Sequence, residues 1–266
     1  MPDPLLGQLP AQQPDRPTRI ALLTDFGAGP YVGQMRLRLT ELAPSVPVVE
    51  LISDLPACRP ELAAYLLPGL ARGMPSTTLY TCVVDPGVGT DRGLIIAQCV
   101  EHGWWLAPDN GLLMPLLRAH PSARVFRLRW RPAQLSATFH GRDLFVPAAA
   151  RLVAGEWLEA EPVETSQLAG ADWPTECARI CYVDAFGNLI TGLPADRLAP
   201  DAEVQAGTHA LNSARTFADV AVGEAFWYRN AFDLVELAVN QGRADRCLSL
   251  GLGDPISSRP PPAAAP

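Results

Sequence analysis

The sequence predicts an α/β N-terminal domain with a mostly parallel sheet and flanking helices, followed by a smaller, barrel-like antiparallel β domain. Two observations predict this fold. Apolar strand-like runs alternate with helical patterns from residue 18 to about 155, which is typical of a parallel sheet covered by helices. From residue 178 onward, short strand-like runs are broken at short intervals by Gly, Asn and Asp, which is typical of small antiparallel sheets and barrels.

The composition bounds the possible functions. With 266 residues, 48% hydrophobic and 18% charged, the chain is long and apolar enough to bury one large core or two modest ones. A net charge of −7 argues against non-specific nucleic-acid binding, which needs a basic face. The six scattered cysteines are expected to be buried free thiols in a reducing compartment. No signal peptide and no membrane-length apolar run is present, so we expect a cytoplasmic protein that binds no membrane.

The first predicted domain, residues 18–160, alternates strands with helices. A helix over 31–44 places Val32, Met35, Leu39 and Leu42 on one side, and a second helix ends at Gly73. The expected strands are 19–26, 46–53, 78–89, 93–100 and 103–111, and the expected helices are 31–44, 60–74 and 147–157. Sheets of this kind bind ligands outside the carboxyl ends of their strands. Asp25 and Asp85 both lie at that edge.

Residues 156–177 are interpreted as a weakly patterned linker, and residues 1–17 and 258–266 as flexible tails. The second predicted domain is residues 178–257. Its expected strand-and-turn segments are 178–193, 202–207, 208–220, 224–230, 233–242 and 247–257.

Several familiar motifs are excluded. "TDFG" precedes "HGRD" by more than a hundred residues, the reverse of the order in protein kinases. "GVGTDRG" does not fit the dinucleotide fingerprint, and a lone Gly-rich turn is weak evidence. Four histidines without paired ligand spacing make a zinc site improbable, so no metal is expected.

Two turns deliver a candidate catalytic cluster. "VVDPGVGTDR" carries Asp85 and Arg92, and "TFHGRD" carries His140. A carboxylate, a guanidinium and an imidazole could converge on one water molecule. The alternative is structural: Asp85 caps the turn, Arg92 pairs with a surface acid, and His140 is a hydrogen-bonded core histidine. Arg142 and Asp143 stand in an apolar run and are expected to brace the turn as a local pair.

Two further stretches have open interpretations. "APDNGLL", residues 107–113, is either a plain tight turn or part of a pocket. In "DAFGNLIT", Asp184, Phe186 and Asn188 occupy alternate positions and are expected on one face of a strand. Polar groups flanking an aromatic ring suit a base or an amino acid. The alternative is a half-buried strand that ends in a turn.

Taken together and in order, "TDFG…YVGQM", "VVDPGVGTDRG", "APDNGLL", "TFHGRDLFVPAAA", "VDAFGNLIT" and "VELAVNQG" closely resemble the S-adenosylmethionine hydroxide adenosyltransferase family. This family is related to the fluorinase and chlorinase enzymes. The resemblance spans roughly residues 19–256 and implies hydrolysis of S-adenosyl-L-methionine to adenosine and L-methionine. It also implies a homotrimer with sites between subunits and no cofactor, the S-adenosyl-L-methionine being the substrate.

The resemblance also implies roles for particular residues. The family's catalytic triad falls on Asp85, Arg92 and His140. The residues implied in substrate binding are Asp25 for the ribose, Asp184 for the methionine ammonium group, Asn188 for adenine, Phe186 and Phe217 as aromatic walls, and Asn230.

Four positions depart from the family pattern: Ser53, Cys58, Gly192 and Ala231. At Ala231 a hydroxyl is missing that bears on recognition of the methionine carboxylate.

We hypothesise that Arg92 and Asp85 act by orientation and electrostatics, and that His140 is the proton acceptor. Two alternatives stay open. One is an S-adenosylmethionine-dependent halogenase, although Asp85 would repel a halide. The other is a non-catalytic protein that binds adenosine or S-adenosylmethionine, which Gly192 and Ala231 motivate.

Overall fold

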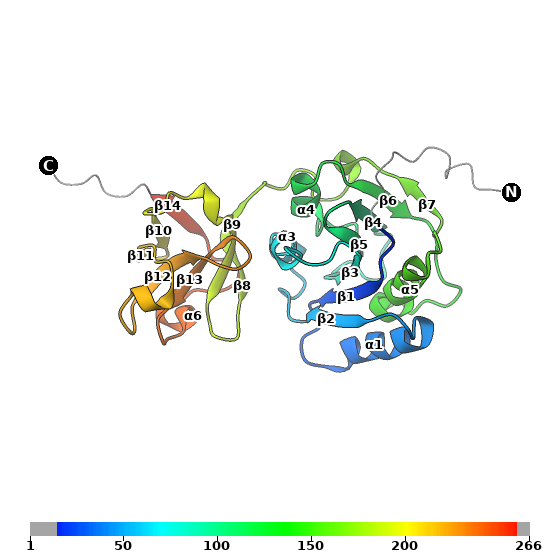
Figure 1. Ribbon diagram of the computed structural model, residues 1–266, viewed down its shortest axis with the longest axis horizontal. Helices are drawn as coiled ribbons and strands as arrows, with labels where there is room; N and C mark the ends of the chain where they lie inside the picture. The colour runs from blue at the N-terminus through cyan, green and yellow to red at the C-terminus, as the bar shows by residue number, and fades with distance from the viewer. Residues whose placement is uncertain (1–14, 260–266) are drawn as a thin grey trace. The chain divides into compact units, whose positions relative to one another are not determined.

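The computed structural model describes residues 15–259, which divide into two compact units (Figure 1). The first consists of the chain up to Pro60 together with Gly73–Trp173, and the second of Glu61–Arg72 together with the chain from Pro174 onward. Segment 61–72, which the sequence placed in the first domain, therefore groups with the second unit. None of the helices within residues 15–259 is long and apolar enough to cross a membrane.

A seven-stranded sheet in the order β2-β1-β3-β5-β4-β6-β7 forms the centre of the first unit. Its strands are β1 (Arg19–Thr24), β2 (Val48–Ile52), β3 (Thr78–Val83), β4 (Leu94–Cys99), β5 (Gly103–Pro108), β6 (Arg124–Leu128) and β7 (Ala160–Pro162). Strands β2, β1, β3 and β5 pair in parallel, β4 is antiparallel to β5 and β6, and β7 is antiparallel to β6. Strand β6 thus runs with the parallel four, so most strands share one direction, as predicted.

The central strands are buried on both faces, which explains why they read as continuous apolar runs. Every residue of β3 and β4 is buried. On one face, Leu79 and Leu106 join the core cluster that includes residues of the two longer helices. On the other, Tyr80 and Trp105 stack with ring centroids 4.2 Å apart.

Helix α1 (Pro30–Leu42) packs against α5 (Val146–Ala154) on one face of the sheet (Figure 1). Val32, Met35 and Leu39 of α1 are buried as expected. Leu42, in the last turn of the helix, is 38% exposed. Helix α5 ends where Gly155 adopts a left-handed φ of 81°. A third helix, α4, spans Met114–Ala119.

The single helix expected over 60–74 is instead two short ones, α2 (Pro60–Ala63) and α3 (Leu67–Leu70). Pro68 lies in the first turn of α3, where a missing backbone N–H is tolerated, but it cannot continue a preceding helix.

The predicted linker and tails are partly ordered. Residues 160–162 of the linker form β7, and a 3₁₀ turn η3 follows at Thr165–Gln167. Arg16, expected in a flexible tail, donates to the carbonyl of Val153 at 2.8 Å. Residues 258 and 259 belong to β14. The remaining tail residues, 1–14 and 260–266, lie outside the described residues.

Two antiparallel sheets form the second unit, in the orders β12-β13-β9-β8 and β11-β10-β14. The strands are β8 (Cys177–Val183), β9 (Leu189–Pro194), β10 (Glu203–Ala206), β11 (His209–Leu211), β12 (Ala225–Arg229), β13 (Leu234–Val239) and β14 (Ile256–Arg259). The helical turns are η4 (Ala195–Arg197), η5 (Phe217–Asp219) and α6 (Ala244–Cys247). Val204 of one sheet and Leu237 of the other lie in the same core.

Gly192, one of the departures from the family pattern, is required by its surroundings. Register shifts in β8 bring Cys177 opposite Gly192. A Cβ at residue 192 would lie 2.6 Å from the Cβ of Cys177 and 3.0 Å from the Sγ of Cys181. These two cysteines are buried and free, as expected for all six, but Cys58 and Cys247 are exposed.

Two Gly→Ala substitutions should have opposite effects on stability. Gly192→Ala overpacks the second unit and is expected to lower its free energy of unfolding by about 1–3 kcal/mol. Gly33→Ala, at an exposed position in α1 with no atom within 4 Å of the new Cβ, is expected to raise stability by about 0.5–1 kcal/mol. Urea denaturation of both variants measures this. A neutral Gly192→Ala would contradict the close packing around residue 192.

Candidate active site

The carboxyl ends of neighbouring strands bring Asp25 and Asp85 to one edge of the first sheet. Strands β1 and β3 pair in parallel with Thr24 opposite Val83. Asp25 follows Thr24 directly, and Asp85 comes two residues after Val83. Both aspartates were predicted at this edge from the sequence.

Arg92 and Asp85 form a buried ion pair. Nε of Arg92 donates to both Oδ1 and Oδ2 of Asp85 at 2.9 Å, and a terminal nitrogen of Arg92 also contacts Oδ2. The two side chains are only 9% and 5% exposed. The alternative that Arg92 pairs with a surface acid is therefore wrong. Removing either partner of an ion pair this far from solvent is costly, because the remaining charge would stay buried without a partner.

The same guanidinium reaches His140, so the three residues of the predicted triad lie together. A terminal nitrogen of Arg92 lies 3.0 Å from Nδ1 of His140. Since a guanidinium can only donate, Nδ1 must accept. A neutral ring then carries its proton on Nε2, which is left as a hydrogen-bond donor.

The electrostatics around His140 favour this neutral ring. Burial lowers the pKa of His140, the cationic Arg92 lowers it further, and Arg131 adds to the effect. The carboxylates of Asp85 and Asp143 act in the opposite direction. The net shift is downward.

A cavity of about 250 Å³ opens beside the triad, and it lies within the first unit. Arg92, Arg131, His140 and Leu135 are among the residues that line it. The volume suits a few water molecules or a small group of a ligand. Both Arg92 and His140 thus border a space that a reactant could occupy.

A five-residue π-helical turn, η2 (Gly141–Phe145), places His140 at its N-terminal end. Such turns are frequent at functional sites. A Cβ on Gly141 would lie 3.2–3.3 Å from Met35, Phe139 and Phe26. The glycine therefore lets the chain pass close to α1 directly after His140.

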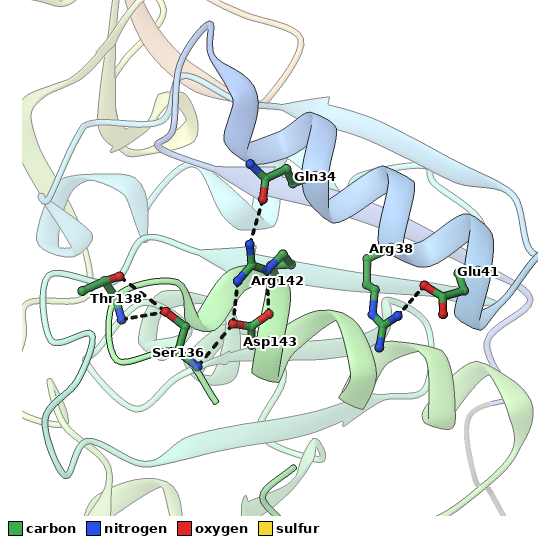
Figure 2. Close-up of polar contacts among 7 residues, drawn as sticks. All are labelled: Gln34, Arg38, Glu41, Ser136, Thr138, Arg142 and Asp143. Atoms are coloured by element: carbon green, nitrogen blue, oxygen red, sulfur yellow. Dashed lines mark hydrogen bonds and ion pairs between the residues drawn. The ribbon is translucent and has the colours of Figure 1, made fainter. Parts of the chain in front are cut away.

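Arg142 and Asp143 brace this turn, as the sequence predicted. Nε of Arg142 donates to Oδ1 of Asp143 at 2.6 Å. Figure 2 shows the pair between Gln34 of α1, which accepts from Arg142 at 2.9 Å, and the backbone N–H of Ser136, which donates to Asp143 at 3.2 Å. The pair therefore ties α1 and the loop before His140 to the π-helical turn.

Asp25 is held by a backbone group. The N–H of Cys58 donates to its Oδ2 at 2.8 Å, and Cys58 has a left-handed φ of 57°. Burial raises the pKa of Asp25, and the nearby Asp85 carboxylate adds to the rise. Ser53, another departure from the family pattern, lies at the same edge and accepts the N–H of Gly27 through its backbone carbonyl.

The stretch "APDNGLL" is a turn with specific ties. Asp109 accepts from Arg127 at 3.0 Å and from the backbone N–H of Ala169 at 2.9 Å. The amide of Asn110 donates to the carbonyl of Val84, next to Asp85, at 2.9 Å. Asn110 therefore supports the loop that carries the catalytic candidates.

In the second unit, Asp184, Phe186 and Asn188 lie in the β8–β9 turn and not along one face of a strand. The expectation of a strand was wrong because β8 ends at Val183 and Gly187 adopts a φ of 85°. Asp184 accepts the backbone N–H of Asn188 at 2.8 Å and its side-chain amide at 3.0 Å. Asn188 is buried, whereas Phe186 is 76% exposed.

Asn230 and Phe217 are also held within the second unit. Oδ1 of Asn230 accepts the N–H groups of Phe232 and Leu234 and so organises the turn between β12 and β13. Ala231 lies in that turn. Phe217 packs edge-to-face on Phe226 and Tyr228 with centroids 5.2 and 5.6 Å apart.

Sequence reasoning missed two residues. Arg131 lines the cavity beside His140. The sequence signal for it was a second arginine four residues after Arg127 in an extended segment. Glu236 is a buried acid on β13. An acid between apolar residues in "LVELAV" was its signal. Within residues 15–259, no group of three or more His, Cys, Asp or Glu side chains is placed to hold a metal ion.

Comparisons with known proteins show which family has this domain arrangement. The N-terminal domain of the SAM hydroxide adenosyltransferase family matches residues 20–161, and its C-terminal domain matches residues 178–257. A protein of Thermus thermophilus named (R)-S-adenosyl-L-methionine hydrolase is 37% identical, covering 89% of this chain and 98% of its own. One of the same name from Salinispora tropica is 34% identical over 88% and 95%.

Solved structures agree with this placement. An uncharacterized conserved protein from Thermotoga maritima superposes with a TM-score of 0.80 at 28% identity, covering 90% of this chain and 99% of its own. A conserved hypothetical protein from Thermus thermophilus gives a TM-score of 0.72 at 32% identity, covering 91% and 99%. The sequence, the two-unit fold and the motif-bearing turns therefore identify this chain as a member of the SAM hydroxide adenosyltransferase family.

Proposed function

We propose that this protein is an enzyme that hydrolyses S-adenosyl-L-methionine to adenosine and L-methionine by attack of water at the ribose C5′. The buried cluster of Asp85, Arg92 and His140 beside a cavity carries the proposal. Family membership and the names of the relatives support it.

The chemistry suits a site that excludes solvent. The water oxygen bonds to C5′ as the C5′–S bond breaks, and the electron pair of that bond leaves with sulfur as neutral methionine. The positive charge of the sulfonium passes to the attacking oxygen, which then loses a proton. A buried, preorganised site avoids reorganising water around these moving charges.

The tautomer of His140 changes the role that we assign to it. Because Nδ1 accepts from Arg92, the ring offers an N–H at Nε2 and acts by holding the attacking water rather than by taking its proton. The oxygen becomes strongly acidic as the C–O bond forms, so a weak base is sufficient. Asp85, the carboxylate of the cluster, receives the proton.

Substrate recognition falls to the residues that the family resemblance implies. Asp25 binds the ribose, Asp184 the methionine ammonium group and Asn188 the adenine, with Phe186 and Phe217 as aromatic walls and Asn230 nearby. The chemistry needs no cofactor, and we propose a homotrimer as the working assembly. The relatives' names specify the R configuration at sulfur, so assays should compare both sulfonium epimers.

A labelling experiment tests the reaction. Purified protein is incubated with S-adenosyl-L-methionine in ¹⁸O-water. The products are separated by chromatography, and the ¹⁸O content of each is measured by mass spectrometry. We expect equal amounts of adenosine and methionine, with the label in the 5′-hydroxyl of adenosine. Adding chloride or fluoride should give no 5′-halo product. Tight binding without release of methionine would instead indicate a non-catalytic protein.

Two substitutions of His140 test its role as a donor. His140→Ala should lower kcat by about 10²–10⁴-fold with a modest change in KM. His140→Gln keeps a side-chain N–H and should retain clearly more activity than His140→Ala. His209→Ala, in the second unit, is the control and should have wild-type kinetics. Equal loss in both His140 variants would indicate proton acceptance, and wild-type kinetics in both would remove His140 from the mechanism.

The pH dependence follows from the lowered pKa of His140. The active ring is neutral, and it protonates only as the pH falls through a pKa below the ordinary 6.5. The profile of kcat/KM should therefore be level near neutrality and decline on an acid limb below pH 6.5. Arg131→Gln removes one of the cations that lower this pKa, so its acid limb should move to higher pH. An unmoved limb would contradict the influence of Arg131 on His140.

A further inference from the structure

A second cavity of the first unit, about 530 Å³ in volume, is lined by Arg92, Arg127, Arg129 and Arg131. We call it the arginine pocket. It shares Arg92 and Arg131 with the smaller cavity beside His140, but it extends to residues that the proposed reaction does not use. A cavity of this size is typical of a site for a small ligand. Four cations on its wall, in a chain of net charge −7, indicate that the ligand is an anion.

Three of these arginines come from one strand and its extension. Arg127 belongs to β6, and Arg129 and Arg131 follow shortly after the end of that strand. They alternate in the sequence with Leu128 and Trp130, whose side chains pack in or against the core of the unit. Since successive side chains of an extended chain point to opposite sides, the arginines are turned away from the core and line the pocket.

Arg131 carries a charge that no carboxylate within residues 15–259 neutralises. Its Nη1 donates to the backbone carbonyls of Leu128 at 3.1 Å and of Trp130 at 2.9 Å. Nε and Nη2 have no assigned acceptor in the same part of the chain. Burial lowers the pKa of Arg131, and the cationic Arg92 and Arg129 lower it further. A bound anion would relieve this repulsion between like charges.

Two other arginines also keep donors for a ligand. The side chain of Arg92 is only 9% exposed, and its bonds to Asp85 and His140 use Nε and one terminal nitrogen. The other terminal nitrogen, Nη1, has no acceptor among the residues that the structure describes. Arg129 pairs with Glu161, but these side chains are 56% and 44% exposed. Because an exposed pair contributes little stability, a ligand can displace Glu161 at small cost.

Two carboxylates line the arginine pocket as well, and they affect an anion differently. Asp109 accepts from Arg127 at 3.0 Å and from the N–H of Ala169 at 2.9 Å, so its charge is offset. Asp91 is exposed and has no assigned partner within residues 15–259. It is therefore expected to weaken the binding of an anion, without blocking it, because solvent screens an exposed charge.

We propose that the arginine pocket is a binding site for a diphosphate group, with one phosphoryl group on Arg92 and Arg131 and the other on Arg129. A guanidinium matches the oxygen spacing of a phosphoryl group with two parallel hydrogen bonds. The volume of the pocket exceeds what a single phosphate needs. The site concerns binding alone and does not depend on the proposed reaction. Its diphosphate belongs either to the free inorganic ion or to a nucleotide.

Calorimetry on the full-length wild-type protein compares pyrophosphate, phosphate and uridine 5′-diphosphate, without divalent cations and at fixed ionic strength. We expect pyrophosphate to bind at least about tenfold more tightly than phosphate, because its second phosphoryl group reaches Arg129. Tighter binding of uridine 5′-diphosphate than of pyrophosphate would assign the site to a nucleotide, and the reverse order to the free ion. Absence of saturable binding by both diphosphates, or equal binding of phosphate and pyrophosphate, would overturn the proposal.

Substitutions with opposite effects locate the bound ion. Arg131→Gln removes the guanidinium that has no acid partner and should weaken pyrophosphate binding by about ten- to a hundredfold. Asp91→Asn removes a like charge and should strengthen it by about two- to fivefold. Arg124→Gln is the matched control, on β6 but outside the lining of the pocket, and should keep the wild-type affinity. Unchanged affinity in Arg131→Gln, or an equal loss in Arg124→Gln, would refute the location.

A second variant covers a failure to fold. Arg131 is exposed, and thermal unfolding establishes whether Arg131→Gln is folded. If it is not, Arg129→Gln removes the contact to the second phosphoryl group, and the affinity for pyrophosphate should fall toward that for phosphate. A preference for pyrophosphate that survives this substitution would count against the pocket equally.

Because this binding needs no turnover, its results are separable from those of the hydrolysis assay. Loss of hydrolysis with intact pyrophosphate binding would reject only the proposed reaction. Hydrolysis by a protein that binds no diphosphate would reject only the site in the arginine pocket.

Discussion

A single guanidinium organises the polar edge of the first unit. Arg92 is bound to the Asp85 carboxylate and to Nδ1 of His140, so its position sets both partners. The tautomer of His140 follows from that one group, because a guanidinium can only donate. A buried pair of this kind contributes little net stability, because desolvation offsets the attraction. What it supplies is a fixed arrangement of donors and charge beside the cavity.

That arrangement depends on structure remote from the reacting atoms. The π-helical turn places His140, and the Arg142–Asp143 pair connects that turn to Gln34 of α1 (Figure 2). Asn110 holds the loop of Asp85 through the carbonyl of Val84. Loops alone would leave three side chains free to move, whereas these ties hold them to the sheet and the helix.

Much of this could be predicted from the sequence, and the failures have physical causes. Strands β1 and β3 read correctly because strands buried on both faces are largely apolar along their length. The strand ends and turns left the grouping of Asp85, Arg92 and His140 as one of two interpretations, and the family resemblance implied it. The helix over 60–74 failed because Pro68 interrupts it, and residues 184–188 failed because period-two spacing cannot distinguish a strand from a turn set by Gly187. Glu236 was missed because an acid in an apolar run is visible in the sequence, but the side chains that donate hydrogen bonds to it are not.

The second unit uses polar burial differently from the first. There the buried carboxylate of Glu236 on β13 accepts from the uncharged donors Tyr228 and Asn230, whereas Asp85 accepts from the cationic Arg92. Neutral donors fix direction without cancelling charge.

The anchoring of Asp25 bears on how relatives of this protein are recognised. Its carboxylate is bound by the main chain of residue 58 and not by that residue's side chain. Evolution can therefore replace the side chain there freely, provided that the replacement tolerates a left-handed backbone. Variation at this position, such as the cysteine found here, therefore says little about whether Asp25 is held in place. Comparisons of family members should give the conformation of the loop more weight than its sequence.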